Sequence, residues 1–164
     1  MKTALMTDLD RKILTAQGYT ELGLYEDAHS SLVALPKEAW DRVDVLETWV
    51  RCLMGEKRWQ EALDMSSRLC VMQPKEPGGF IHSAYCLHEL GRTEEALALL
   101  QGGPKTLRTK AVFYYNLGCY CARLGRMEEA RKLLEKSFEM DKDNELRREA
   151  RKDPDLAELR SQLL

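Results

Sequence analysis

The sequence predicts an all-α fold, a right-handed α-α superhelix of four stacked helix pairs with a C-terminal cap. Three observations predict it. The 164 residues include only 5 prolines and 10 glycines, and long stretches are rich in Leu, Ala, Glu, Arg and Lys, which are good helix formers. A six-residue motif recurs at a fixed interval of 34 residues. Around each copy, apolar residues are spaced three and four apart, which is the period of an amphipathic helix.

The repeated motif sets the domain organisation. Gly91–Ala96 and Gly125–Ala130 differ at one position, and related segments begin at Gly23 and Lys57. The alanine that ends each copy falls on a strict 34-residue lattice at Ala28, Ala62, Ala96 and Ala130. We therefore predict a single domain over residues 1–164, with repeats at about 9–42, 43–76, 77–110 and 111–144 and a capping helix at about 145–162.

Each unit is predicted to form two antiparallel helices of roughly 12 residues, joined by a turn at the start of the motif. Helix axes approach to roughly 8–10 Å only where the contact side chains are small. The lattice alanines on the second helices would meet small residues of the first helices, at Ala16, Ala84 and Gly118. Acidic residues before each alanine fall in the first helical turn, where the helix dipole favours anions. Thr93 is expected to be the N-cap of its helix.

The last unit carries a pattern of aromatic, x2, Leu-Gly, x2, then Ala-x3-Leu, at Tyr114, Leu117, Gly118, Cys121, Ala130 and Leu134. Over about residues 9 to 144 the chain resembles the tetratricopeptide repeat (TPR) family. Cys121 and Leu134 stand where the family has Tyr and Phe, and Lys142 stands where it has Pro. The resemblance implies stacked helix pairs whose first helices line a concave groove that receives an extended peptide or a partner helix.

At the positions of the first helices that match the groove-facing positions of the family, the resemblance implies a peptide-binding groove. Its residues are Ile13, Gln17, Glu47, Arg51, Ile81, Tyr85, His88, Tyr115 and Cys119. The N-terminal half of this groove is polar, and its C-terminal half is apolar and aromatic. Tyr85 and Tyr115 are predicted to flank one peptide from two sides. The Lys and Asn carboxylate clamp of many TPR peptide sites is predicted to be absent, because its positions carry Ile13, Gln17, Thr48 and Arg51. Co-chaperone function is therefore not supported.

Two segments depart from the regular pattern. Residues 101–104 read Gln-Gly-Gly-Pro and end a helix early, so that residues 102 to 109 are predicted to form a loop. Near the C-terminus, Asp153 and Pro154 are predicted to start a short helix as N-cap and first helical residue. Its leucines would cover the open apolar end of the superhelix. The alternative is that this terminal segment folds into the groove and covers it.

Composition narrows the function class. The chain has 25 Lys and Arg residues and 27 Asp and Glu residues, a net charge of −2. This balance provides no positive electrostatic field that would attract the phosphates of a nucleic acid. No apolar run approaches the roughly 18 residues that span a bilayer, and the N-terminus does not read as a signal peptide. The number of cysteines, five, is odd, and their spacing is not that of a disulfide framework. We therefore predict free thiols and a cytoplasmic location.

No nucleophile elbow, phosphate-binding loop or dinucleotide motif is present in the sequence. The chain is therefore predicted to be a non-enzymatic adaptor that binds a protein or peptide, with no cofactor and no metal. A class II type III secretion chaperone is an alternative, because those proteins are similar in size and share a loose pattern from Lys75 to Ala96. An alternative of another class is a metal- or thiol-dependent enzyme built on His82, Cys86 and His88. The oligomeric state is left open.

Overall fold

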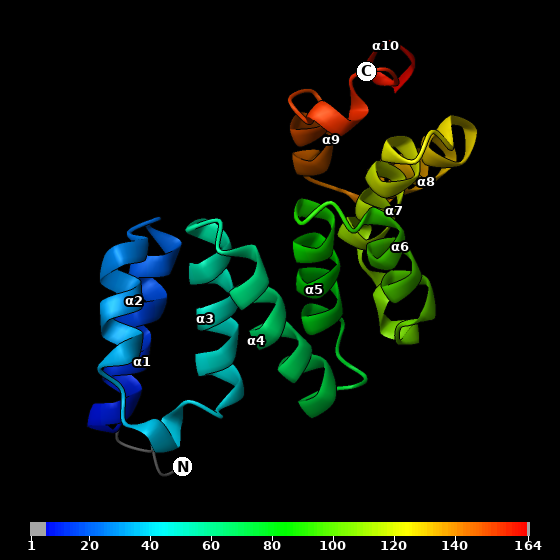
Figure 1. Ribbon diagram of the computed structural model, residues 1–164. Coiled ribbons are helices and arrows are strands. Elements are labelled where there is room, and N and C mark those ends of the chain that lie inside the picture. The colour runs from blue at the N-terminus through cyan, green and yellow to red at the C-terminus, as the bar shows by residue number, and fades with distance from the viewer. Residues whose placement is uncertain (1–5, 164) are drawn as a thin grey trace, which may run out of the picture.

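Helices account for all of the repetitive structure in the part of the chain that is described. A computed structural model describes residues 6–163, and within them it shows no strand (Figure 1). Four helix pairs follow one another: α1 (Asp8–Glu21) and α2 (Tyr25–Val33), α3 (Val43–Gly55) and α4 (Trp59–Met72), α5 (Pro77–Glu89) and α6 (Thr93–Gly102), α7 (Ala111–Arg123) and α8 (Met127–Met140). The prediction of an all-α superhelix is confirmed.

The pairs stack side by side. Among the first helices, α1 contacts α3, α3 contacts α5 and α5 contacts α7, while each of α2, α4 and α6 also contacts the first helix of the next pair. The first helices therefore form the inner layer of the solenoid. The remaining elements are the 3-10 helices η1 (Lys37–Ala39), η2 (Lys105–Thr109) and η3 (Pro154–Leu156), and the short helices α9 (Glu145–Ala150) and α10 (Arg160–Leu163).

Each pair turns through one residue in the left-handed region. These residues are Gly23 (φ 73°), Lys57 (φ 59°), Gly91 (φ 77°) and Gly125 (φ 77°). In each turn the next residue donates its backbone N–H across the end of the first helix, as from Leu24 to the carbonyl of Tyr19 at 2.9 Å. Glycine adopts this conformation without strain, whereas Lys57 places a Cβ there. The second turn is therefore the strained copy of the four.

Small residues bring the two helices of a pair together. All four lattice alanines are fully buried. A Cβ added to Gly118 on α7 would lie 2.6 Å from Cγ of Leu134 and 3.3 Å from the carbonyl oxygen of Ala130 on α8. The absence of a side chain at Gly118 therefore allows α7 and α8 to approach closely, as the sequence pattern predicts.

The start of α6 differs from the prediction. Arg92 is its N-cap, and Thr93 is buried as the first helical residue with its hydroxyl 3.0 Å from Nδ1 of His88. The prediction that Thr93 caps the helix is wrong, because its hydroxyl faces α5 and not the free N–H groups of α6. Arg92 pairs with Glu95 through two hydrogen bonds of 2.7 Å. The same arginine-to-glutamate pairing joins Arg58 to Glu61 and Arg126 to Glu129.

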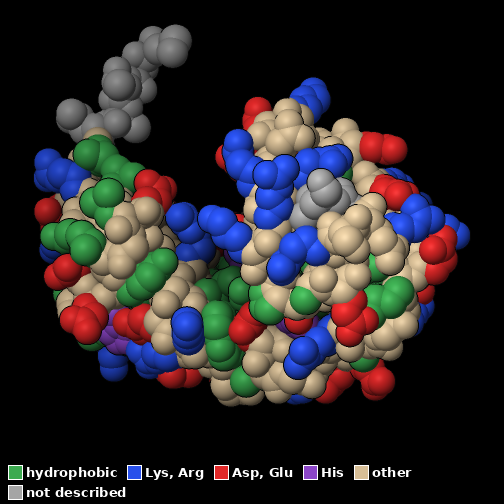
Figure 2. Space-filling view, turned by 90° about the horizontal axis from the view of Figure 1, so that it is seen from above, with side chains coloured by type: hydrophobic (Ala, Val, Ile, Leu, Met, Phe, Trp, Pro, Cys, Tyr) green, Lys and Arg blue, Asp and Glu red, His purple; other side chains and the backbone are tan. Residues whose placement is uncertain are grey.

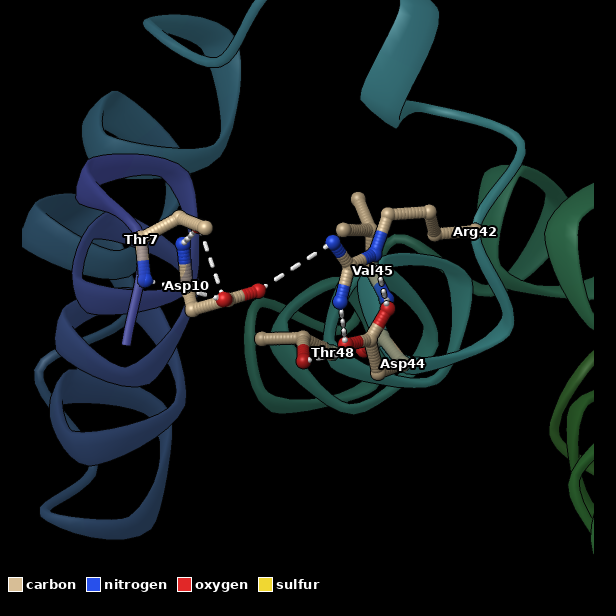
Figure 3. A network of polar contacts seen from close by, with 6 residues as sticks. All are labelled: Thr7, Asp10, Arg42, Asp44, Val45 and Thr48. Carbon is tan, nitrogen blue, oxygen red and sulfur yellow. Dashed lines mark hydrogen bonds and ion pairs between the residues drawn. The ribbon is translucent and has the colours of Figure 1, made fainter. Parts of the chain in front are cut away.

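A polar network joins the N-terminal ends of α1 and α3 (Figure 3). Thr7 and Asp10 form a capping box at the start of α1. The guanidinium of Arg42 donates to Asp10 at 3.3 Å and to Asp44 at 2.8 Å, so that it bridges the two helices. Water screens these charges because the side chains are about two-fifths exposed, and the network therefore sets orientation more than stability.

Two second helices are short. α2 ends at Val33 with Pro36 close behind, and α6 ends at Gly102 before Gly103 and Pro104. The segment predicted as a loop after α6 is partly helical, because residues 105–109 form η2 and its Leu107 is fully buried. The connection after α6 begins with glycine and proline, which favour an irregular backbone, but burial of Leu107 gives it a defined position in the fold.

Candidate functional site

The open part of the concave surface is a hollow between α1, α3 and α5. Figure 2 shows the molecule hollowed between its N-terminal helices and its C-terminal segment, with Lys and Arg side chains along the rim. A cavity of about 430 Å³ lies in it, lined by Thr20, Glu21, Tyr25, Arg51, Met54, Gly55, Trp59, His82 and Tyr85. We call this cavity the open groove.

Aromatic side chains form much of the open groove. The ring of Tyr25 lies against the C-terminal end of α3, where a Cβ on Gly55 would be only 2.2 Å from its Cε1 atom. Trp59 and Tyr85 meet edge to face, with ring centroids 5.8 Å apart. Tyr85 is 36% exposed. Burial, followed by the charge of Glu89, raises the pKa of Tyr85 to about 12, so its hydroxyl stays protonated and can donate.

Few charges face the open groove. Arg51 lies 3.9 Å from Glu21, and both side chains are largely exposed. Burial, and then the nearby Arg51, lower the pKa of His82 below its ordinary value, so its ring is neutral at pH 7. Arg51 and Glu21 therefore supply the fixed charges of a surface that is otherwise aromatic and polar.

The C-terminal segment covers the other end of the concave surface. The hydroxyl of Tyr115 donates to Oδ2 of Asp153 at 2.8 Å, and Sγ of Cys119 lies 3.5 Å from the same oxygen. Nε2 of His88 lies 2.7 Å from Oδ2 of Asp155. Burial is the main reason that the pKa values of Tyr115 and Cys119 are raised. The sequence had left open whether this segment lies over the end of the superhelix or over the groove, and here it does both.

The anchors of this segment are apolar. Leu156 and Leu159 are 1% and 2% exposed, and Ala150 is fully buried. Asp153 caps η3 by accepting the N–H of Asp155 at 3.0 Å. Because these side chains belong to the main hydrophobic core, residues 150–159 are a fixed part of the fold.

Eight of the nine predicted groove residues are distributed over three environments. Arg51 and Tyr85 line the open groove. Gln17, Glu47 and Ile81 are at least partly exposed, on α1, α3 and α5. Tyr115 and Cys119 are 6% and 4% exposed, and the largely buried His88 contacts Asp155; all three lie beneath the C-terminal segment.

Ile13 requires a correction. It is 2% exposed and lies in the core, on the face of α1 that also buries Ala16 and Thr20. These residues are three and seven positions apart, which places them on one side of a helix. Ile13 therefore packs inside the fold and does not line the groove.

Two groove residues were missed by the sequence reading. Tyr25 and Trp59 open the second helices of the first two units, 34 residues apart, and both line the open groove. The corresponding positions of the later units are Thr93 and Met127. The available signal was an aromatic residue that recurs at the same repeat position in two units.

One group of possible metal ligands occurs among residues 6–163. Atoms of His29, Cys52 and Glu56 lie within 4.8 Å of one another. The guanidinium of Arg58 is 3.1 Å from Nδ1 of His29 and 3.0 Å from Oε2 of Glu56, and burial raises the pKa of the Cys52 thiol to about 11. A cation of the protein itself therefore already neutralises this group, which joins α2 to the turn before α4.

Comparisons with known proteins agree with this architecture. The tetratricopeptide repeat family matches residues 111–144. MamA MSR-1 C2 has a similar structure, with a TM-score of 0.68 at 17% identity over 84% of this chain and 79% of that chain. A MamA mutant gives 0.65 at 19% identity over 84% and 80%, respectively. The structure of MamA from residue 41 to the end, from Desulfovibrio magneticus RS-1, gives 0.70 at 18% identity over 83% and 77%. No curated protein matches the sequence.

The repeat lattice, the matched last repeat and the shared fold agree with one another. Residues 111–144 match a tetratricopeptide repeat, and more than four-fifths of the chain shares the all-α solenoid fold of the MamA structures. None of the helices within residues 6–163 has the length and apolar character needed to cross a membrane.

Proposed function

We propose that this protein is a non-enzymatic adaptor that binds an extended peptide segment of a partner protein in the open groove. One observation carries the proposal. Tyr25, Met54, Trp59 and Tyr85 gather apolar and aromatic surface in a hollow of about 430 Å³ on the inner layer of the solenoid. Aromatic side chains in such a position commonly supply most of the binding free energy of an interface.

The open groove favours a peptide over other partners. Its lining combines aromatic rings with the charged side chains of Glu21 and Arg51, which does not suit a wholly apolar ligand. It presents one arginine, which is too little positive charge for nucleic acid. All five cysteines are free, which suits a reducing compartment such as the cytoplasm. The class II secretion chaperone remains an alternative within the binding class, and no contact among residues 6–163 favours it over a general adaptor.

Peptide selection tests the proposal. Twelve-residue peptides are selected from a random library on the wild-type protein, and their affinities are measured by fluorescence polarisation. We expect Trp59→Ala to weaken binding by about tenfold or more, because a truncated aromatic anchor commonly costs about 2 kcal/mol. Val71→Ala, at a position on α4 that is 82% exposed and outside the groove, is the control. Equal affinity of the Trp59→Ala variant and wild type for every selected peptide would refute the groove as the binding site.

A further inference from the structure

A second cavity adjoins the open groove at Tyr85, which lines both. It lies between α5, α7 and residues 149–155, and its volume is about 170 Å³. A protein cavity of about 150 Å³ accommodates a benzene molecule. The second cavity therefore has room for the end of one side chain and not for a folded or extended segment. We call it the acidic cavity, because Glu89, Glu149, Asp153 and Asp155 line it.

Three tyrosines are among the residues that line the acidic cavity. They are Tyr85, Tyr115 and Tyr120, and the imidazole of His88 lies against Tyr120 with ring centroids 4.8 Å apart. The faces of aromatic rings carry partial negative charge and attract cations, most strongly where water is excluded. The rings thus favour a positively charged ligand over a neutral one.

Carboxylates outnumber cations around the same space. Glu89, Glu149, Asp153 and Asp155 line it, against the single ammonium of Lys152. Glu89 and Glu149 make no ion pair within residues 6–163. Asp153 and Asp155 accept hydrogen bonds from neutral or aromatic donors.

Neighbouring hydroxyl and thiol groups respond to this charge. Burial is the first cause of the raised pKa values of Tyr85 and Cys119, and the charges of Glu89 and Asp153 add to it. Two guanidinium groups lie beside the cavity: Arg123 is 66% exposed and 3.9 Å from Asp155, and Arg160 donates to the backbone carbonyl of Asp153 at 3.0 Å. The four carboxylates therefore still outnumber Lys152 and the two arginines, which disfavours an anionic ligand.

One polar group in the wall is left without a partner. Tyr120 is 1% exposed, and its hydroxyl has no hydrogen-bond partner in the described part of the chain. Burying a hydroxyl in this way is unfavourable, and buried polar groups without partners are rare in folded proteins. A ligand that donates a hydrogen bond would satisfy this oxygen.

We propose that the acidic cavity binds a lysine or arginine side chain of the peptide that occupies the open groove. This inference rests on the proposed function, because the cavity meets the groove at Tyr85 and a residue of a bound peptide could enter from there. Ammonium and guanidinium groups carry the positive charge that the carboxylates and rings favour, and they supply the donor that the Tyr120 hydroxyl lacks. The partner peptide is then expected to carry a basic residue next to the part held by Trp59 and Tyr25.

Short probes test the cavity separately from the groove. N-acetyl-lysine methylamide, its arginine counterpart, and the norleucine and glutamate counterparts are each titrated into the full chain, and tyrosine ring resonances are followed by NMR. We expect saturable shifts with a millimolar dissociation constant for the two basic probes, and no saturation for the other two. Equal shifts with norleucine, or saturation with glutamate alone, would overturn the proposal.

Two variants identify the groups responsible. Tyr120→Phe should weaken lysine binding by about threefold or more and melt no lower than wild type, because it removes a buried hydroxyl that has no partner. A merely structural hydroxyl would instead lower the melting temperature when removed. Glu89→Gln should also weaken binding by about threefold or more, whereas Glu94→Gln on the exposed side of α6 should not. Unchanged affinity in both cavity variants would refute the site.

The outcome does not depend on the partner peptide. The probes are single blocked residues that cannot span the open groove, so they report on the acidic cavity even if no peptide binds the groove. Conversely, peptides that lose affinity in Trp59→Ala but carry no enriched basic residue would support the groove and overturn the acidic cavity.

Discussion

The contact between Tyr115 and Asp153 adds a hydrogen bond to the apolar contacts that hold the C-terminal segment over the concave surface. The Tyr115 hydroxyl donates to Asp153 at 2.8 Å, and Tyr115 is 6% exposed. A hydrogen bond to a charged group contributes about 1.5–3 kcal/mol, and the partial exposure of Asp153 places this bond near the lower value. We expect Tyr115→Phe to lower the free energy of unfolding by about 1.5 kcal/mol. For a chain of this size that corresponds to a melting temperature about 3–6 °C lower.

A double-mutant cycle isolates the contact. Asp153→Ala also removes the cap of η3, which by itself costs about 1 kcal/mol. Urea denaturation of the two single variants and the double variant should therefore show a coupling of about 1 kcal/mol or more. Tyr19→Phe, on a half-buried ring of α1, is the control and should show no coupling to Asp153→Ala. A Tyr115 coupling indistinguishable from additivity, within about 0.5 kcal/mol, would refute the view that this hydrogen bond holds the segment in place.

Three further outcomes are expected. Lys57→Gly should raise the free energy of unfolding by about 0.5–1 kcal/mol, because φ at this position is 59°; a destabilised variant in chemical denaturation would contradict the strained turn. Ala130→Leu should cost about 1–3 kcal/mol by overpacking the α7–α8 contact, whereas Ala157→Leu on the exposed surface should cost less than about 0.5 kcal/mol; equal denaturation midpoints would contradict the close approach. The hydrogen bond from His88 holds the pKa of Asp155 below its ordinary value of 3.8, so its stabilising contribution should be complete above about pH 4 and be lost as the pH falls further. Acid unfolding of Asp155→Asn should lack that component, and identical profiles for variant and wild type would count against it.

The sequence by itself determined the helix pairs and their stacking. The 34-residue lattice places one alanine at each helix crossing, and all four are fully buried. The positions of the turns could also be predicted from the sequence. Three of the four turns carry glycine, and the fourth has Lys57 at the same position of the 34-residue repeat. These features depend on residues close in sequence and on a period, so local sterics and helical geometry are enough to predict them.

The content of the groove could be predicted only in part. Arg51 and Tyr85 line it as the phase of the repeat indicates. Ile13 stands at the same repeat position as Glu47, 34 residues later, yet Ile13 packs inward with Ala16 whereas Glu47 is exposed. Phase alone gives the side of a helix within about one residue, and a shift of one residue separates core from surface.

Tertiary structure alone decided which end of the concave surface is open. Asp153 and Asp155 lie 38 and 67 residues from the side chains of Tyr115 and His88 that they contact. No local pattern predicts such a contact, since it depends on where the short helices after α8 lead the chain. The buried leucines of that segment fix its path, and the path closes the C-terminal half of the surface while leaving Tyr25, Trp59 and the open groove accessible.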